Sequence, residues 1–452
     1  MGVRFSISKD SKTRTKELVN LTFPIMIEQS FIMLMGIINS AMVAILGPHE
    51  LSAAGHINNS SQIPIALLAA LGTGGTVLVA QAFGARNIVK AKKAAGQSIA
   101  LTMFVSVAIT VLLMLFSTNV INLLFVGGEA ETIYAASTYF FYINISLPFL
   151  AIGQTIFGVM RGAGDVKTPM FVVIIMNVVN VIFSFLLIPL LYISGAGLAL
   201  LISRIVGFLL AFIFILSKKR KLYLNEFNFY IPDKAIQKEI FTIGIPTGIE
   251  NLLFNIGRTL TLMMVVSLGA YAMAANIVIL NVMTIFLVPG VAISSSVMVM
   301  IGQRVGKGEI EDVIKTTLFS VKACMIAMFI FSLILLPSGA FVANIFSLPS
   351  PAISYFNMLY ILLLIMSPLF WPVGFITPSA LRAVKDVKFN MVVTILTTWI
   401  FRVLMSYVLI ILGFGLLSAW VGFFADWIVR GVIFYTRLIR GKWKGVINEQ
   451  VR

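Results

Sequence analysis

Long apolar stretches follow one another along almost the whole chain and are separated by short polar connections. A helix needs roughly 20 apolar residues to cross the hydrocarbon core of a bilayer, which is about 30 Å thick. Twelve stretches reach this length, at residues 18–46, 57–83, 95–117, 134–158, 169–192, 195–217, 240–268, 272–301, 317–337, 353–380, 389–412 and 415–437. The pattern predicts an all-α integral membrane protein with twelve transmembrane helices.

A repeat divides the predicted helices into two halves. PIMIEQ begins at Pro24 and PTGIEN begins at Pro246, so their positions differ by 222 (246 minus 24). QAFG and QRVG share this offset, and MRGAGDVKTPM and LRAVKDVKFNM begin at Met160 and Leu381, which differ by 221 (381 minus 160). Because six is an even number, both six-helix copies enter the membrane from the same side, so we expect two lobes related by a pseudo-two-fold axis along the membrane normal. Such repeats are typical of transporters that open a central cleft alternately to each side.

The apolar stretches also set the expected domain boundaries. No polar interruption is long enough for an independently folding soluble domain. The first apolar stretch is too long for a signal peptide and is expected to remain as helix one. We expect a cytoplasmic tail at 1–17, an N-terminal lobe at 18–217, a linker at 218–239, a C-terminal lobe at 240–437 and a second tail at 438–452.

The positive charge of the chain follows the same alternation. The formal net charge is +16, but every second connection carries the Lys and Arg residues, as in Lys218–Lys221, whereas LGPHEL, GGEAE, SGAG, LGAY and LGFG contain none. This is the positive-inside distribution, and it predicts that both termini are cytoplasmic. We therefore expect the lipid bilayer as the partner and no nucleic acid, in the plasma membrane of a prokaryote.

Two acidic residues fall inside predicted helices at equivalent positions of the repeat. Glu28 and Glu250 each lie ten residues beyond the expected helix starts near Leu18 and Ile240 (28 minus 18, 250 minus 240), about 15 Å along the axis and near the bilayer midplane. An ionisable group at this depth commonly marks a substrate, ion or proton pathway. No basic residue lies three or four positions from Glu250, which favours a functional role; pairing with a buried Arg or with backbone amides is the structural alternative.

Other candidates are a charged pair, polar residues and helix breaks. Asp426 and Arg430 have the i, i+4 spacing of an intrahelical ion pair, and we interpret them as mainly structural. The polar residues expected to face the cleft are Gln29, Asn251 and Arg258. The candidate bending points for gating, with simple helix curvature as the alternative, are Pro289, Pro368 and Pro372.

Composition narrows the chemistry further. The 36 Phe and 22 Met residues offer a flexible, apolar lining for lipophilic small molecules of varied shape. Cys324 is the only cysteine, so the chain has no internal disulfide and no Cys-based metal site. GTGGT, from Gly72 to Thr76, lacks the Lys-Ser/Thr ending of a phosphate loop and is interpreted as a helix-packing motif. Without a nucleotide motif, we expect an ion gradient as the energy source, no enzymatic activity and no cofactor beyond a coupling Na⁺ or H⁺.

Several motifs in this order resemble the multidrug and toxic compound extrusion (MATE) family of cation-coupled antiporters. They are LTFPIMIEQ with GIINSAMVAILG, LVAQAFGARNIVKAKKAAGQS, MRGAGDVKTPM, NVVNVIFSFLLIP, GIPTGIENLLF and WVGFFADWIVRGVIFYTRLIRGKW. The match covers almost the whole chain. The resemblance implies a twelve-helix exporter that exchanges sodium ions or protons for amphipathic, often cationic, organic compounds, and one chain suffices for this mechanism, so we expect a functional monomer.

The chain departs from this family in the N-terminal half. Where many members carry Asp in helix one, this chain has Asn39, and where many carry Asp after the Asn pair of helix five, it has Ser184. Asn177 and Asn180 remain, and the polar position of helix six corresponds to Leu200. An uncharged pocket cannot exchange a proton and holds a cation weakly, so the usual N-terminal coupling site is in doubt.

Coupling then falls to the carboxylates that remain inside predicted helices, which are Glu250, Glu28 and Asp426. We place Glu250 first, as a residue that binds Na⁺ or H⁺ and whose neutralisation biases the side to which the cleft opens. A flippase for lipid-linked saccharides is the main alternative, because the arginines inside predicted helices could form a basic cavity for phosphates. An intramembrane transferase would need clustered acidic residues near an interface, which the sequence lacks, and a channel would need more than two repeats around a pore.

Overall fold

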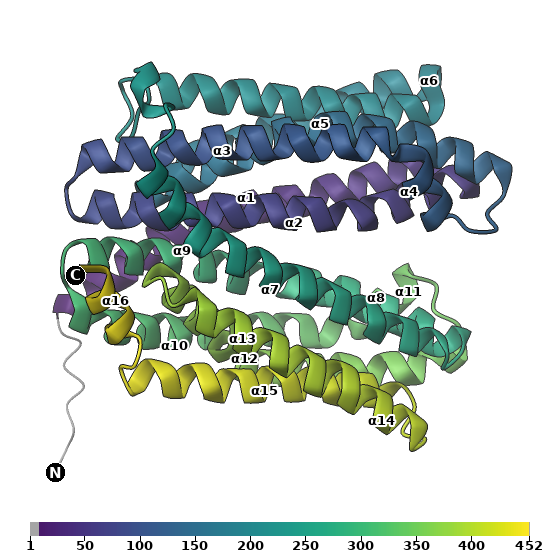
Figure 1. Cartoon of the computed structure of the whole chain (residues 1–452). Helices are drawn as coiled ribbons and strands as arrows, with labels where there is room; N and C mark the ends of the chain where they lie inside the picture. The colour runs from purple at the N-terminus through teal and green to yellow at the C-terminus, as the bar shows by residue number, and fades with distance from the viewer. Residues whose placement is uncertain (1–8, 452) are drawn as a thin grey trace, which may run out of the picture. The chain divides into compact units, whose positions relative to one another are not determined.

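The computed structural model describes the backbone of residues 9–451 and the side chains of residues 12–226 and 228–447. Within these residues the chain is helical and contains no strand (Figure 1), as the all-α prediction requires. The helices are α1 (Lys9–Ala44), α2 (Pro48–Gly84), α3 (Ile88–Leu115), α4 (Ser117–Leu124), α5 (Ala130–Gly162), α6 (Lys167–Leu216), η1 (Phe227–Phe229), α7 (Lys234–Val266), α8 (Ala270–Phe286), α9 (Val288–Gly306), α10 (Ile310–Leu335), η2 (Leu336–Ser338), α11 (Gly339–Ile345), α12 (Ser350–Ala383), α13 (Val387–Thr397), η3 (Thr398–Met405), α14 (Ser406–Ile411), α15 (Leu416–Ile439) and α16 (Lys444–Val451).

Eleven helices of the described part of the chain are long and apolar enough to cross a membrane. One of them, α6, contains two of the predicted spans, because its backbone leaves the helical region at Tyr192 (φ 53°, ψ −131°). The eighth predicted span is divided at Leu287, and Pro289 lies in the first turn of α9, where its missing N–H costs no helical hydrogen bond. The twelve predicted transmembrane segments are therefore confirmed.

The chain forms two compact units. The N-terminal unit comprises residues 27–248, and the C-terminal unit comprises the chain from Ile249 onward together with the start of α1 up to Met26. Helices α1 and α7 thus each belong to both units, and their points of passage are equivalent in the repeat, because 248 minus 26 is again 222. Glu28 and Glu250 each lie two residues beyond such a point (28 minus 26, 250 minus 248).

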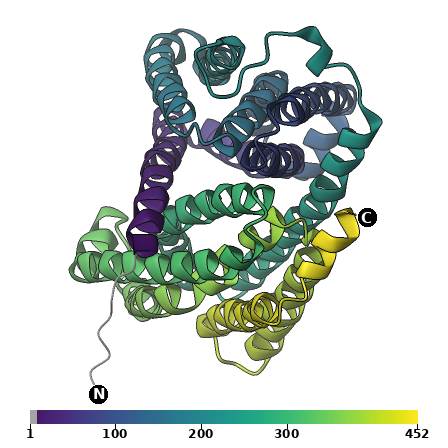
Figure 2. The same ribbon diagram turned by 90° about the vertical axis from the view of Figure 1, so that its left-hand side faces the viewer.

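Small residues allow close helix packing in the N-terminal unit, whose dark blue helices are seen nearly end-on in Figure 2. A Cβ atom added at Gly75 of α2 would collide with Ser98 of α3, and one added at Gly158 of α5 would collide with Thr76 of α2. The interpretation of GTGGT as a packing motif is therefore confirmed.

Aromatic rings fill the core of the C-terminal unit. Trp371 of α12 stacks on Phe375 with 4.8 Å between ring centroids, and Trp427 of α15 meets Phe375 edge-on at 5.9 Å. A Cβ atom added at Gly290 would collide with the Trp371 ring. The residue after Pro289 is therefore glycine because the backbone of α9 passes directly against this ring.

Two short helices, α4 and α11, were not predicted. They begin at equivalent positions of the repeat, since 339 minus 117 is 222. Each directly follows a long apolar span, and neither has the length that identifies a transmembrane helix. The hydrophobic pattern could not separate them from the ends of the spans before them.

Helices α1 and α7, which each belong to both units, are called the bridging helices below. They begin earlier than predicted, at Lys9 and Lys234 instead of near residues 18 and 240. The additional turns are polar, as in KDSKTRTKE, so they extend each helix beyond its apolar segment. Glu17 in this polar part of α1 pairs with Arg304 of α9 at 2.7 Å, which ties it to the C-terminal unit.

The predicted linker is fastened to α3 of the N-terminal unit by Gln97. Its Nε2 atom donates hydrogen bonds to the carbonyl oxygens of Phe229 (3.2 Å) and Ile231. Its Oε1 atom accepts hydrogen bonds from the backbone N–H of Asp233 and from Nε2 of Gln237, both at 3.1 Å. One buried side chain thus fixes the segment from η1 to the first turn of α7.

Candidate functional site

Glu28 lies in α1 and is fully buried in the N-terminal unit (0% exposed). Its Oε1 atom accepts a hydrogen bond of 2.6 Å from Nη1 of Arg161, near the end of α5. Its Oε2 atom is buried and has no hydrogen-bond partner among the described residues. The glutamate therefore belongs to an ion pair that uses one of its two oxygens.

Glu250 has a matching environment in the C-terminal unit. It lies in α7, is 4% exposed, and accepts a hydrogen bond of 2.6 Å from Nη2 of Arg382 in α12. Thr394 of α13 donates a second hydrogen bond of 3.0 Å to the same oxygen, Oε1. The other oxygen, Oε2, is buried and has no hydrogen-bond partner within the described part of the chain.

The two arginine partners were not predicted. Glu250 has no basic neighbour three or four positions away on its own helix, but Arg382 reaches it from another helix. Arg161 and Arg382 stand at the same place in the repeated motifs MRGAGDVKTPM and LRAVKDVKFNM. The recurrence of a glutamate and an arginine at nearly one offset was the signal that could have identified the pairs.

This arrangement leaves each glutamate able to gain a cation. One carboxylate oxygen of each glutamate is held by an arginine, and the unpartnered oxygen is free to accept a proton or to coordinate Na⁺. Burial makes such a site responsive, because in a medium of low dielectric constant a change of one charge has large electrostatic effects. The geometry is thus compatible both with a structural ion pair and with a site for a coupling ion.

Asp426 and Arg430 form the predicted intrahelical pair in α15, with Nη2 of Arg430 at 2.7 Å from Oδ1 of Asp426. Arg402 also approaches this carboxylate, at 3.3 Å from its Nη2 atom to Oδ2 of Asp426. Arg402 lies in η3, a π-helical segment between α13 and α14, and was not predicted to join the pair. One buried carboxylate therefore faces two buried guanidinium groups.

Three of the four polar residues predicted for an N-terminal pocket lie on α6 and are buried. Asn177 donates a hydrogen bond of 2.9 Å to the carbonyl oxygen of Val173, and its Oδ1 atom is without a partner in the described structure. Asn180 has no hydrogen-bond partner for either amide atom in the described residues, and Ser184 is buried on the same helix. Asn39, on α1, is partly exposed.

The remaining candidates are more exposed or lie within regular helix. Gln29 and Asn251 are half-buried and Arg258 is exposed. Pro368 and Pro372 lie inside α12, which runs without a break through both.

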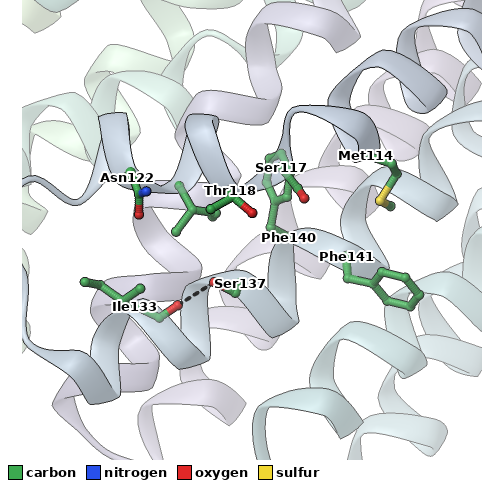
Figure 3. A pocket seen from close by; sticks show the side chains of 9 residues that line it. Met114, Ser117, Thr118, Asn122, Ile133, Ser137, Phe140 and Phe141 are labelled. Carbon is green, nitrogen blue, oxygen red and sulfur yellow. Dashed lines mark hydrogen bonds between the residues drawn. The ribbon is translucent and has the colours of Figure 1, made fainter.

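A hollow of about 270 Å³ lies in the N-terminal unit among the end of α3, α4 and α5 (Figure 3). Ser117, Thr118 and Asn122 line it together with the rings of Phe140 and Phe141. None of the predicted site residues lines this hollow. No group of three or more His, Cys, Asp or Glu side chains in the described residues could hold a metal ion.

Comparison with known proteins agrees with the repeat. The sequence model of the MatE family matches residues 24–186 and 246–408, two segments with the offset of the repeat (246 minus 24, 408 minus 186). The uncharacterized transporter YisQ of Bacillus subtilis is 27% identical over 444 residues, which cover 95% of each chain. The probable multidrug resistance protein NorM of Thermotoga maritima is 28% identical over 447 residues, 95% of this chain and 93% of its own.

The fold is likewise similar to that of solved transporters. A structure described as the outward-facing conformation of a multidrug resistance MATE family transporter superposes with a TM-score of 0.87 at 20% identity and covers 96% of each chain. Both halves of the sequence match the same family model, and the twelve membrane segments form the same fold. The chain therefore belongs to the MatE family of multidrug and toxic compound extrusion transporters.

Proposed function

We propose that the protein exports amphipathic organic compounds in exchange for Na⁺ or H⁺ by alternating access, and that Glu250 binds the coupling ion. Membership of the family and the multidrug resistance named for the T. maritima relative support export. The observation that carries the coupling assignment is the environment of Glu250: Oε1 is held by Arg382 and Thr394, and Oε2 is buried without a partner in the described residues.

The proposed coupling works through the charge of the Glu250–Arg382 pair. With the carboxylate ionised, the two charges balance and the pair holds α7 to α12. When Oε2 takes up a proton or Na⁺, the balance changes to one net positive charge in a buried site, which is costly and weakens the hold on Arg382. Because Glu250 lies two residues beyond the point where α7 passes from one unit to the other, this change acts on a helix that both units share.

The proposed substrates are lipophilic. The family resemblance implies cationic compounds, and the carboxylates of the two glutamates would be the groups to attract them. Both carboxylates are already paired with arginines, however, and the C-terminal unit has two buried guanidinium groups beside one carboxylate. A purely cationic substrate is therefore disfavoured in that unit.

Reconstituted proteoliposomes test the coupling. We expect a Na⁺ or pH gradient, imposed separately, to drive efflux of a fluorescent amphipathic compound in the wild-type protein. In Glu250→Gln we expect this efflux to fall at least about tenfold, while counterflow of labelled against unlabelled substrate without a gradient persists, because only the coupling step is removed. If gradient-driven efflux survives the substitution, Glu250 does not bind the coupling ion and its ion pair with Arg382 is structural.

A flippase for lipid-linked saccharides is the second candidate function. The observation that favours it is the excess of buried guanidinium groups around Asp426, since arginine binds phosphate groups well. Translocation of a fluorescent polyprenyl-phosphate saccharide in the same proteoliposomes, without gradient-driven efflux of any soluble amphipathic compound, would select this function over export.

A further inference from the structure

The C-terminal unit contains more positive than negative charge inside its membrane-spanning helices. Asp426 is 0% exposed, and Arg402 and Arg430 are each 2% exposed. The single carboxylate contacts both guanidinium groups, so these three described side chains together carry one net positive charge. Uncompensated charge at this depth is costly and is by default functional.

Arg258 of α7 adds to this excess. Arg258 lies one turn beyond Phe254 on α7, and the guanidinium carbon of Arg402 lies 4.8 Å from the ring centroid of Phe254, so this part of α7 packs beside Arg402. Arg258 is exposed and forms neither a hydrogen bond nor an ion pair with any residue that the structure describes. The cluster of Arg258, Arg402, Asp426 and Arg430, called the arginine cluster below, therefore extends from a buried core to an accessible cation.

The two buried arginines differ in how many of their guanidinium N–H groups donate hydrogen bonds. Arg430 donates to Oγ1 of Thr397 (3.3 Å) and of Thr398 (2.8 Å) in addition to Asp426. Arg402 meets Asp426 at 3.3 Å, and its Nε atom is buried without a hydrogen-bond partner in the described part of the chain. A guanidinium group presents N–H donors in a fork that fits a carboxylate or a phosphate, so Arg402 retains donor capacity for an added oxyanion.

Aromatic rings surround this unused donor. The guanidinium carbon of Arg402 lies 4.1 Å from the ring centroid of Phe423 and 4.8 Å from that of Phe254. Trp427 packs on Phe423 at 4.6 Å, and its own indole N–H is buried without a partner in the described residues. Such rings hold a cation over their faces and also bind an apolar tail, so an amphipathic anion fits both parts of the surroundings.

The backbone at Arg402 is also unusual. Residues Thr398–Met405 form a π-helix, a rare element that occurs frequently at functional sites. The same segment supplies Arg402 and, through Thr398, a contact to Arg430. The π-helix thus places the arginine with the unused donor beside the carboxylate of α15.

We propose that the arginine cluster binds an oxyanion, the carboxylate or phosphate head of an amphipathic molecule, within the C-terminal unit. That the bound molecule is a transported substrate rests on the proposed export function; the oxyanion site itself does not. The oxyanion can come from an exported organic anion or from the head group of a lipid phosphate, and both offer the same chemistry to Arg402.

Binding to the purified, full-length protein in a neutral maltoside detergent tests the site directly. The probes are pyrenebutanoate, its neutral amide and a pyrenebutyl trimethylammonium of similar size, with binding followed by fluorescence anisotropy. We expect the carboxylate to bind at least about tenfold more tightly than the amide, because it gains charge-assisted hydrogen bonds. We expect the trimethylammonium to bind no better than the amide.

Variants then locate the binding site. Arg402→Gln is expected to abolish the preference for the carboxylate over the amide and to leave the affinity for the amide unchanged. If this buried variant fails to fold, Arg258→Gln, at an exposed position, is expected to reduce the preference several-fold. The matched control is Arg204→Gln, which removes a membrane arginine of the N-terminal unit and is expected to leave the preference unchanged.

The source of the oxyanion follows from competition. Displacement of the probe by a soluble alkyl carboxylate supports an exported organic anion, and displacement by polyprenyl phosphate alone supports a lipid head group. Equal binding of carboxylate and amide, tighter binding of the trimethylammonium, or a preference unaffected by Arg402→Gln and Arg258→Gln would overturn the proposal. Because the binding assay needs no gradient, a failure to observe export would not affect these results. It would contradict only the proposal that the bound molecule is a transported substrate.

Discussion

The two halves of the chain share a repeat but differ in the charge of their interiors. Helix α6 of the N-terminal half carries Asn180 and Arg204, whereas the C-terminal half carries Arg402 in η3 and Asp426 in α15. The N-terminal unit thus has an amide without partners in the described residues and an arginine that donates to Ser146, where the C-terminal unit has an ion-paired cluster. The two halves therefore share one fold while their interiors carry different polar and charged groups.

The glutamate–arginine pairs, in contrast, are present in both halves, with the same distance of 2.6 Å between the charged atoms. Their hydrogen bonds differ in one donor. Thr394 donates a hydrogen bond to Glu250, whereas Val173, which lies at the offset of the neighbouring motif in the N-terminal half, has no side-chain donor (394 minus 173 is 221). The shared pairs therefore fasten the bridging helices in both halves, and the added hydroxyl distinguishes the C-terminal carboxylate.

The largest effect is expected from removing the arginine partners. Arg161→Ala and Arg382→Ala each leave a buried carboxylate without its cation, which costs on the order of 3 to 5 kcal/mol of folding free energy. We expect the greater loss for Arg161→Ala, because Glu250 retains the hydrogen bond from Thr394 and Glu28 has no such donor in the described residues. Thermal unfolding in detergent measures both variants, and equal losses would remove the distinction between the two sites.

The second-largest loss of stability is expected from neutralising the carboxylate of the arginine cluster. Asp426→Asn leaves Arg402 and Arg430 buried without an anion, and we expect a loss of about 3 kcal/mol. The double variant Asp426→Asn with Arg402→Gln should recover part of this loss, since it removes one of the two uncompensated cations. The same thermal unfolding assay applies, and a double variant less stable than the single one would contradict the charge count.

A smaller effect is expected from Thr394→Val, which gives the C-terminal site the residue found in the N-terminal half. Loss of a hydrogen bond to a carboxylate costs about 1.5 kcal/mol or slightly more. Thermal unfolding measures the loss, with Val173→Thr as the matched change in the other half. No measurable change for Thr394→Val would mean that the hydroxyl does not distinguish the two carboxylates.

The smallest expected effect is a gain, and not a loss, of folding stability. Asn180→Leu replaces a buried amide whose donor and acceptor are both unpartnered in the described structure, so we expect the protein to gain about 1 kcal/mol of stability. Gradient-driven efflux measured on the same variant shows whether the pocket on α6 takes part in transport. A loss of stability would indicate that Asn180 has a partner in the membrane.

Most of the fold follows from hydrophobic length and the repeat. The twelve spans, the break at Tyr192 and the division near Pro289 all lie where apolar stretches end or where proline removes a backbone donor. The short helices α4 and α11 and the π-helix at Thr398–Met405 could not be predicted. Each depends on how a few residues pack against neighbouring helices, and an apolar sequence is compatible with several such arrangements.

The candidate site was predictable only in part. The positions of Glu28 and Glu250 inside helices α1 and α7 and the Asp426–Arg430 pair follow from spacing along one helix, which the sequence contains directly. The partners Arg161, Arg382 and Arg402 lie on other helices, and only tertiary structure brings them together.

The most direct test of the account is gradient-driven efflux from proteoliposomes containing Glu250→Gln or Glu28→Gln, with both proteins shown to be folded and equally reconstituted. We place coupling in the C-terminal unit. We therefore predict that Glu250→Gln reduces efflux at least about tenfold and that Glu28→Gln retains most of it. Equal loss in both variants, or loss in Glu28→Gln alone, would contradict this assignment.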